Sequence, residues 1–414
     1  MQATELKDGI FWVGAIDWDV RDFHGYQTSL GSTYNAYLVR DTKTVLFDTV
    51  KKGFLDDLVN HISQVTNPSD IDYIVVDHVE MDHSAELPNV IDLVRPEKVF
   101  CSANGKKALL AHFHRDDWPL EVVANGDKLE LGDRTVQFFE TKMLHWPDSM
   151  MSYFADQGLL VSQDGFGQHW ATSERFDDEV DVGVLYYETK WYYANIILPY
   201  SNFVQKLLQN VRESGMSIDM IAPDHGLIWR RDVDKVLGMY DQWSRQVTCA
   251  KAVVVYDTMW ESTTKMAHAV AEGIQKQGVG VKVMNLRSVH RSDVIAELQD
   301  SRALVVGSPT LNNGMMPRVA DVLTYLKGLR PAGKIGAAFG SYGWGGEAVK
   351  LINASLEEMN VELLHEGVRV NYVPTDADLA QCVGLGEKIG SAARDQAACE
   401  IPSQPANRCR ERQG

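Results

Sequence analysis

Short apolar runs separated by turns dominate the first part of the chain. The runs Phe11–Trp18, Ser32–Val39 and Thr44–Phe47 are typical of β-strands. Between Gly53 and Ile62, apolar residues recur at the spacing of an amphipathic helix. The mostly apolar run Asp72–Val76 predicts a strand buried on both faces. This half of the chain is therefore expected to mix strands and helices without a regular repeat.

The pattern changes to strict alternation of strands and helices from Lys251 onward. Before that point, Glu121–Ser162 predicts further strands, and residues 183–213 and 232–247 predict helices. Alternating strands and helices predict a doubly wound parallel sheet. Its expected strands are Ala252–Tyr256, Gly280–Met284, Ala303–Val306, Ile335–Phe339 and about Val361–Val370.

Length and composition, together with these patterns, predict how many domains the chain forms. The chain has 414 residues, of which 45% are hydrophobic, so it can form two or three globular domains. The change of pattern predicts one domain over residues 1–250 and a second over 251–393. Residues 394–414 are polar and contain proline, which is typical of a disordered tail.

Charge and cysteine content narrow the possible partners and location. The net charge of −17 disfavours nucleic acid and anionic lipid surfaces as partners. No apolar run is long enough for a membrane span, and the N-terminus does not look like a signal peptide. The five cysteines form no C-x-x-C pair, so we expect neither a disulfide framework nor a built-in rubredoxin site. A reducing cytoplasmic location is the expectation.

The strongest chemical signal is the segment Asp77–His83, which reads Asp-His-Val-Glu-Met-Asp-His directly after a predicted buried strand. Alternate side chains share a face, so this segment can direct several ligands toward one centre. His145, Asp164 and His225 also follow strand-like runs. A single histidine at a strand end is more often structural, but four such segments together predict a metal site at the carboxyl ends of strands.

These residues resemble the motif of the metallo-β-lactamase superfamily, His-x-His-x-Asp-His followed by later His, Asp and His ligands. This sequence departs from that motif because Glu80 stands where the second histidine is usual. Mixed carboxylate and imidazole ligands suit iron or manganese better than zinc. The resemblance implies two metal ions with Asp164 as the bridge. The neighbours Asp82 and His83 must both turn inward, which is expected to strain the loop and makes His83 the least secure ligand. The implied sets are His78, Glu80 and His145 on one ion and Asp82, His83 and His225 on the other.

Three loops of the second domain carry hydroxyl, amide and aromatic side chains at predicted strand ends. The first, Tyr256–Thr263, opens a helix, where backbone N–H groups and hydroxyls can hold a phosphate. The second, Gly307–Gly314, and the third, Gly340–Gly346, offer small residues and rings suited to a flat ligand. No nucleoside-triphosphate or dinucleotide motif occurs here. Tight turns without a ligand are the plain alternative.

This half resembles flavodoxin over about Lys251–Ala393, which implies a bound FMN. Carried over residue by residue, the resemblance implies that FMN is held by Thr258, Met259, Trp260, Ser262, Thr263, Pro309, Thr310, Asn312, Asn313, Ser341, Tyr342, Gly343 and Trp344.

A lactamase-like domain with Glu80 followed by flavodoxin resembles the flavodiiron proteins, specifically the rubredoxin:oxygen oxidoreductase type. The resemblance covers about residues 1–393. It implies two non-haem irons and one FMN per chain, and reduction of dioxygen to water, of nitric oxide to nitrous oxide, or of both. It further implies electrons from rubredoxin and a head-to-tail homodimer or a dimer of dimers. The sequence does not choose between the two substrates.

The resemblance also implies roles near the metal site for residues that are not ligands. His24 and Tyr193 correspond to pocket residues near the irons and are candidate hydrogen-bond or proton donors. Asp48 is a candidate for orienting a ligand histidine. Other histidines, His169 among them, are expected to be structural or at the surface. Two other functions remain: a zinc hydrolase with a flavodoxin appendage, and an electron carrier without catalysis.

Overall fold

The computed structural model describes residues 2–398 and divides the chain into two compact units, residues 1–245 and 246–414. The division falls five residues before the boundary expected from the sequence. Helix α12 continues to Asp395, so the first two residues of the expected tail are helical. The remainder of that tail, from residue 399, lies outside the described residues.

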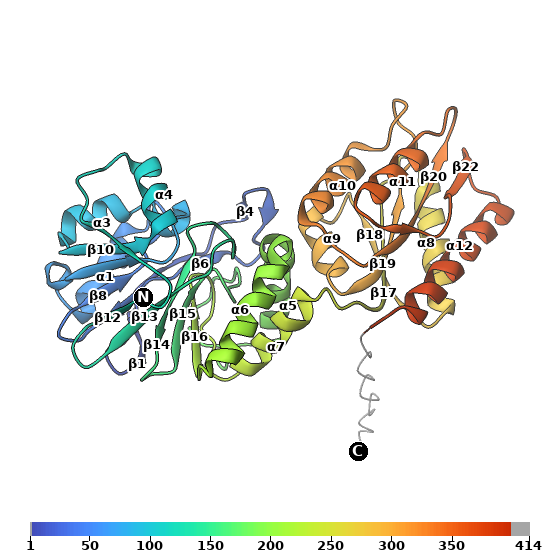
Figure 1. Cartoon of the computed structure of the whole chain (residues 1–414). Coiled ribbons are helices and arrows are strands. Elements are labelled where there is room, and N and C mark those ends of the chain that lie inside the picture. The colour runs from blue at the N-terminus through green and yellow to red at the C-terminus, as the bar shows by residue number, and fades with distance from the viewer. Residues whose placement is uncertain (1, 399–414) are drawn as a thin grey trace, which may run out of the picture. The chain divides into compact units, whose positions relative to one another are not determined.

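Two facing sheets form the centre of the first unit (Figure 1). Their inner faces supply one apolar core that includes Trp12, Phe47, Phe138 and Phe154. The seven-stranded sheet has the order β1 (Thr4–Lys7), β2 (Ile10–Trp12), β7 (Tyr37–Val39), β8 (Val45–Phe47), β9 (Tyr73–Val76), β10 (Lys98–Ser102) and β11 (Leu120–Val123). The five-stranded sheet has the order β12 (Lys128–Glu130), β13 (Thr135–Glu140), β14 (Met150–Phe154), β15 (Leu159–Gln163) and β16 (Met220–Pro223).

Short elements connect these strands and interrupt several of the predicted ones. The predicted strand Phe11–Trp18 is split at Val13 and Gly14. Gly14 packs so closely on the backbone of Tyr34 and Asn35 that a side chain there would clash. The remaining strands are β3 (Ala15–Asp17), β4 (Asp22–Phe23), β5 (Tyr26–Gln27) and β6 (Ser32–Tyr34). The helices are α1 (Leu55–Val65), the 3-10 turn Pro68–Asp70, α2 (Met81–Ser84), α3 (Leu87–Val94), α4 (Ala103–Phe113), α5 (Val182–Tyr192), α6 (Ser201–Ser214) and α7 (Val233–Ser244).

The helix predicted over residues 183–213 is not continuous. Between α5 and α6 the chain forms a π turn at Tyr193–Ile197 and a 3-10 turn at Leu198–Tyr200. Pro199 lies in this segment, and proline removes a backbone donor from the helical ladder.

The second unit is built on one parallel sheet with helices on both faces (Figure 1). The apolar run Ala252–Tyr256 forms an inner strand that is buried because both faces of the sheet are covered. Its strands, in spatial order, are β18 (Gly280–Asn285), β17 (Cys249–Tyr256), β19 (Ser301–Gly307), β20 (Ile335–Tyr342) and an edge made of β21 (Glu362–Leu363) and β22 (Val368–Asn371). Its helices are α8 (Ser262–Lys276), α9 (Arg291–Leu298), α10 (Pro317–Leu329), α11 (Ala348–Glu358) and α12 (Asp376–Asp395).

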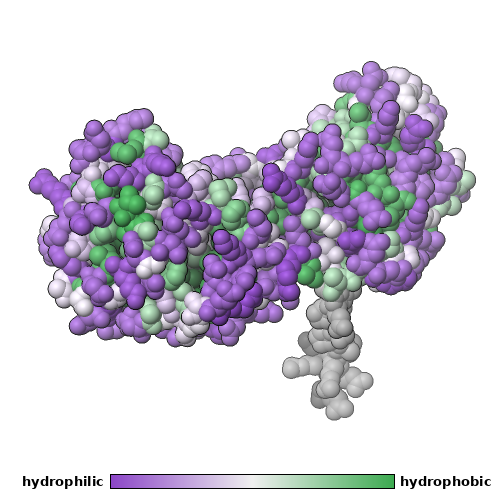
Figure 2. All heavy atoms as spheres, in the orientation of Figure 1, coloured by the Kyte–Doolittle hydropathy of each residue, from purple (hydrophilic) through white to green (hydrophobic). Residues whose placement is uncertain are grey.

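Net charge is distributed unequally between the two units. Residues 1–245 contain 22 Lys and Arg against 39 Asp and Glu, which accounts for the whole net charge of −17. Residues 246–414 contain 18 of each and are neutral. Polar residues cover most of the visible face of each unit (Figure 2). Among residues 2–398, no helix combines the length and apolar content needed to cross a membrane.

Close packing of α8 against α12 depends on small residues. A Cβ on Gly386 would lie 2.0 Å from the carbonyl oxygen of Val270, whereas a Cβ on Gly384, in the same helix, would meet nothing within 4 Å. We therefore expect Gly386→Ala to destabilise the second unit by about 1–3 kcal/mol, because overpacking forces the helices apart. Gly384→Ala is the matched control and should not destabilise. Thermal unfolding of both variants checks this, and equal stabilities would contradict it.

Candidate metal centre and cofactor pocket

The candidate ligands of the first unit follow strand ends. Strand β9 ends at Val76, and the loop after it carries His78 and Glu80. Asp82 and His83 lie in the single helical turn α2. Because adjacent residues of a helical turn point about 100° apart, both side chains reach inward without backbone strain. The strain expected for this pair is therefore absent.

The structure brings all seven predicted ligands into two neighbouring groups. His78, Glu80, His145 and Asp164 form one group, and Asp82, His83 and His225 form the other. Within each group the ligand atoms all lie within 4.8 Å of one another. His145 lies in the loop between β13 and β14, and Asp164 and His225 follow β15 and β16. Segments far apart in the sequence thus meet at one edge of the sandwich.

Asp164 lies between the two groups. Its Oδ2 is 2.8 Å from Nε2 of His145 and 3.4 Å from Nε2 of His78. Its Oδ1 is 3.1 Å from Nε2 of His83 and 3.3 Å from Nε2 of His225. Burial favours the protonated form, but the imidazoles, His83 foremost, hold the pKa of Asp164 well below its usual range. One carboxylate therefore presents an oxygen to each group.

A pocket of about 160 Å³ lies at the carboxyl ends of the strands in the second unit. Eight of the thirteen residues predicted to hold FMN line it, and two residues not predicted, Tyr372 and Val373, complete it. The eight are Met259, Trp260, Ser262, Pro309, Thr310, Ser341, Tyr342 and Gly343. Tyr372 and Val373 follow β22 and are strongly exposed in the structure. The signal available in the sequence was an apolar pair just after a strand-like run.

The other five predicted residues do not line this pocket. Thr258 and Thr263 are buried in the loop before α8 and its first turn, and Thr263 Oγ1 lies 3.3 Å from Ser341 Oγ. Asn312 and Asn313 adopt left-handed backbone conformations in a tight turn. Trp344 is 79% exposed.

The start of α8 can accept an anion. Its N-cap residue, Glu261, has a φ of 65° and makes no side-chain capping hydrogen bond, so the first N–H groups of the helix need other partners. The hydroxyl of Thr258 is buried and forms no hydrogen bond within the described residues. Donors left without partners at a helix start favour a bound phosphate.

Comparison with known proteins agrees with this pair of sites. Residues 33–226 match the ODP family of β-lactamase domains, and residues 254–386 match flavodoxin. The chain is 46% identical to the rubredoxin-oxygen oxidoreductase of Megalodesulfovibrio gigas, over 96% of this chain and 100% of that protein. It is 45% identical to a nitric oxide reductase of Moorella thermoacetica, over 95% and 100% respectively. The crystal structure of the flavodiiron protein from Giardia intestinalis superposes with a TM-score of 0.93 at 34% identity, over 96% of this chain and 98% of that one.

This chain belongs to the flavodiiron protein family. The family predicted from the sequence is thus confirmed, and so is the fold class, a metallo-β-lactamase-like αββα sandwich followed by a flavodoxin-like doubly wound sheet.

The donor atoms of this flavodiiron protein fit the metals that the family name implies. Both ring nitrogens of His83, Oδ1 of Asp82 and Oδ1 of Asp164 are buried and form no hydrogen bond within residues 2–398. Buried polar atoms are costly without a partner, and a metal ion supplies one. The mixture of imidazole and carboxylate donors suits iron. The chemistry of the site and the family therefore agree.

Two ligand histidines are oriented by acceptors on their second nitrogen. Asp148 Oδ2 lies 3.0 Å from Nδ1 of His78 and accepts the backbone N–H of Val79 at 2.8 Å. Nδ1 of His225 lies 2.6 Å from the carbonyl oxygen of Thr33. These contacts leave Nε2 of each ring free to face a metal.

Asp48 has a different role from the one expected. Its Oδ1 accepts the backbone N–H groups of Asp77, at 2.9 Å, and of His78, at 3.3 Å. It therefore fixes the backbone of the ligand loop and does not orient a histidine ring. Burial raises the pKa of Asp48 to about 7.

His24 joins the ligand set to the surface. Its Nε2 lies 3.1 Å from Oε1 of Glu80, while its side chain is 66% exposed. The hydrogen bond with Glu80 raises the pKa of His24 above its usual value. A partly exposed imidazole in contact with a ligand of the centre can pass a proton between solvent and the centre.

Tyr193 does not face the metal groups, contrary to expectation. Its hydroxyl lies 3.0 Å from Ser201 Oγ, and its ring packs against Tyr240 and Trp243. The preceding residue, Tyr192, has its ring centre 6.0 Å from that of His225. Tyr192 is the last residue of α5 and Tyr193 the first of the π turn, and adjacent residues of a helix point about 100° apart, so only one of the two faces the centre.

His169, expected to be structural or at the surface, lies beside the second ligand group. Its ring centre is 4.6 Å from that of His225 and 5.0 Å from that of Tyr192. Nδ1 lies 2.8 Å from Ser32 Oγ. Burial, together with the neighbouring His225, holds the pKa of His169 well below its usual value, so the ring is neutral. Its position five residues after Asp164, on the same loop, was the only signal in the sequence.

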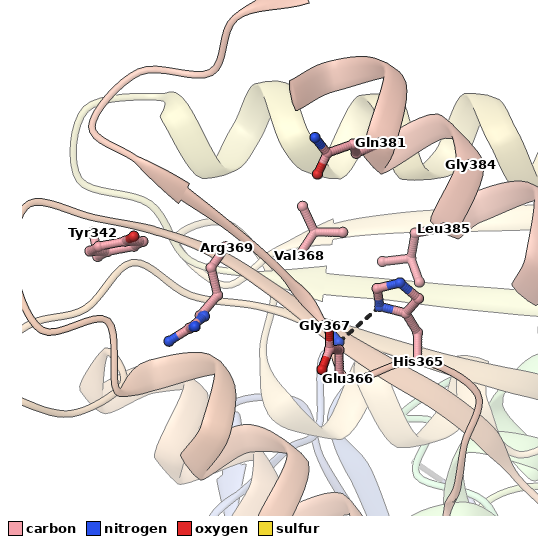
Figure 3. A pocket seen from close by; sticks show the side chains of 9 residues that line it. All are labelled: Tyr342, His365, Glu366, Gly367, Val368, Arg369, Gln381, Gly384 and Leu385. Atoms are coloured by element: carbon pink, nitrogen blue, oxygen red, sulfur yellow. Dashed lines mark hydrogen bonds between the residues drawn. The ribbon is translucent and has the colours of Figure 1, made fainter. Parts of the chain in front are cut away.

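A separate groove of the second unit lies between β22 and α12 (Figure 3). It shares Tyr342 with the flavin pocket, but its other lining residues include Glu366, Arg369 and Gln381. Nδ1 of His365 accepts the backbone N–H of Gly367 at 2.9 Å, so that ring is held in the turn before β22. None of the hydroxyls of the helix-start loop lines this groove, and it is not the flavin site.

The contact between Asp148 and His78 generates a test. Asp148→Asn keeps the size of the side chain but removes the charge that aligns the His78 ring, so we expect metal affinity to fall about 10–100-fold. Iron retained against increasing chelator concentration measures the change. Asp156→Asn, an exposed carboxylate of the same unit, is the control. Equal iron retention in the two variants would count against an orienting role.

Proposed function

We propose that this flavodiiron protein reduces dioxygen to water, nitric oxide to nitrous oxide, or both, with electrons that pass through FMN. The observation that carries the proposal is the Asp164 carboxylate, which presents one oxygen to each of two buried ligand groups. The flavin pocket on the same chain supports it. The relatives named for oxygen and nitric oxide reduction are almost equally similar, so the proposal covers both substrates, with a primarily nitric oxide-reducing enzyme as the alternative.

Electron counts explain why the two sites occur on one chain. Reduction of dioxygen to two waters consumes four electrons and four protons, and coupling of two nitric oxide molecules to nitrous oxide and water consumes two of each. When bound, two ferrous ions and a reduced FMN together supply four electrons and open coordination positions for a diatomic ligand. The protein has to hold these groups, orient their ligands and deliver protons.

The proposed metal ligands follow the two groups in the structure. Asp164 serves both ions, and Asp148 and the carbonyl oxygen of Thr33 keep the imidazoles aligned. We assign His78, Glu80 and His145 to one iron and Asp82, His83 and His225 to the other.

FMN binding is proposed at the pocket of the second unit. The uncapped start of α8, with Ser262 and Thr263, would hold the phosphate, and Trp260 and Tyr342 would contact the ring. Thr258, Asn312, Asn313 and Trp344 remain predicted contacts outside the pocket lining.

His24 is the proposed route for protons. It contacts Glu80 at the centre and has most of its side chain in solvent, so it can take a proton from water and hold it near a bound substrate. Phe23, whose ring lies beside those of His24 and His169, limits the entry of water on this side. Both features suit a reaction that consumes protons inside a dry site.

The zinc hydrolase considered from the sequence is disfavoured. Glu80 occupies the ligand position in contact with His78 and His145, and the two relatives above are named as reductases. A visible absorption spectrum distinguishes a flavodiiron reductase from a zinc hydrolase, since FMN and ferric iron absorb visible light and zinc does not. The purely electron-carrying alternative would leave a buried ligand set without use.

Reduced rubredoxin is the proposed electron donor, supported by the name of the Megalodesulfovibrio gigas relative. A cytoplasmic location remains a prediction, and cell fractionation tests it.

A head-to-tail homodimer, alone or paired into a dimer of dimers, is the proposed assembly. Apolar side chains are exposed near both sites: Trp260, Trp344, Tyr372 and Val373 at the flavin loops, and Trp18, Leu30 and Met81 around the ligand loops. Exposed apolar groups of this size are typical of interfaces. Such an interface would bring the flavin of one chain to the metal centre of another.

Trp18→Glu tests the assembly. Trp18 is 48% exposed, and a charge at its position should shift the dimer toward monomer in sedimentation velocity because a buried charge lacks a partner. Leu93→Glu, at a residue 47% exposed, is the matched control and should leave the dimer intact. A wild-type protein that is an active monomer would refute the proposed dimer.

Turnover with reduced rubredoxin tests the function itself. Wild-type protein made in iron-sufficient medium should contain roughly two irons per chain and consume dioxygen at four electrons each, or nitric oxide at one electron each. Asp164→Ala should lose iron and turnover on both substrates while it keeps FMN, because Asp164 faces both groups. Oxygen and nitric oxide electrodes, with metal analysis, measure these quantities.

Two controls accompany that experiment. Asp156→Ala removes an exposed carboxylate of the same unit and should behave as wild type. His24→Ala should keep iron but turn over more slowly, since proton delivery is lost. Peroxide as the main product, or protein that contains only zinc, would refute the proposal.

A further inference from the structure

A buried carboxylate lies immediately before the loop at the start of α8. Asp257, at the end of β17, is fully buried, and its Oδ1 accepts the backbone N–H of Thr258 at 2.7 Å. The second unit as a whole is neutral, so the charges around this loop decide its affinity for anions. An unbalanced negative charge here would repel a phosphate held by the same loop.

Arg287 reaches this carboxylate from a different strand end. It follows β18, the parallel neighbour of β17, and its Nε donates to Oδ1 of Asp257 at 3.3 Å. Its Nη2 also donates to the backbone carbonyl oxygen of Thr258. One guanidinium group thus binds both the buried charge and the backbone of the loop, a geometry that suits arginine better than lysine.

A second guanidinium group faces the other oxygen. Nη1 of Arg318, at the start of α10, lies 3.8 Å from Oδ2 of Asp257. That oxygen forms no hydrogen bond within the described residues. Two positive side chains from two elements therefore surround one buried negative charge, and both arginines keep about half of their side chains in solvent. These two positive charges match the two carboxylates of the segment Asp257–Thr263, Asp257 and Glu261, at the expected position of the phosphate.

We propose that Arg287, assisted by Arg318, is a positioning residue that gives the helix-start loop its affinity for the flavin phosphate by neutralising Asp257. The inference rests on the FMN site of the proposed function and adds residues to it. Arg287 would also turn the Thr258 carbonyl away from the ligand, so that N–H groups of the loop can face it. Neither arginine lines the flavin pocket, which separates this role from direct contact with the ring.

A double-mutant experiment tests charge neutralisation. Apoprotein of the full chain is titrated with FMN, and the quenching of flavin fluorescence gives Kd. Arg287→Ala should weaken FMN binding about tenfold or more, because Asp257 is left as an unbalanced charge. Adding Asp257→Asn, which keeps an oxygen for the Thr258 N–H, should restore Kd to within about threefold of wild type, and Arg287→Lys should give an intermediate value.

Arg394→Ala is the matched control. Arg394 also contacts a carboxylate and a backbone carbonyl in the same unit, Asp395 and Gln277, away from the flavin loops, so its loss should leave Kd unchanged. Wild-type affinity in Arg287→Ala overturns the inference, and so does a double variant as weak as the single one. Wild-type apoprotein that does not bind FMN overturns the proposed function and this inference with it.

Discussion

The carboxylate of Asp164, buried among four imidazoles, is the interaction on which the first unit depends. A buried anion is expensive unless it is surrounded by partners, and here those partners come from three separate segments of the chain. Strands β9, β15 and β16 end at the same edge of the sandwich and bring these loops together. The sheet positions the ligands, and the metals that the family implies satisfy donors that the protein leaves unpaired.

The second unit also contains a buried carboxylate, but its charge is balanced by arginine side chains and not by imidazoles. The carboxylate is that of Asp257, and the arginines keep about half of their surface in solvent. The result is a loop that holds a negative residue and still suits an anionic ligand. In both units, the loops at the ends of strands carry the side chains that form the site.

Several features of the site were predictable because they depend on local order. Alternation in the segment Asp77–His83 and three later strand ends indicated six of the seven ligands that the structure brings together, and the resemblance to the metallo-β-lactamase motif added His83. Eight residues lining the flavin pocket lie on three loops that the sequence singled out, and the resemblance to flavodoxin named them. Tyr193 was wrong, because its ring packs against Tyr240 and Trp243 and the adjacent Tyr192 lies beside His225. His169 was missed, because a lone histidine gives no local signal.

The sequence by itself determined the two kinds of domain and the types of ligand, since periodicity and ligand spacing are local properties of the chain. Only the tertiary structure decided how the ligands divide around Asp164, that Asp48 supports a backbone segment, and that Arg287 and Arg318 meet Asp257. Each of those contacts joins residues from different strand ends. Their distances depend on which strands are neighbours in a sheet, and strand order arises from packing of the whole domain.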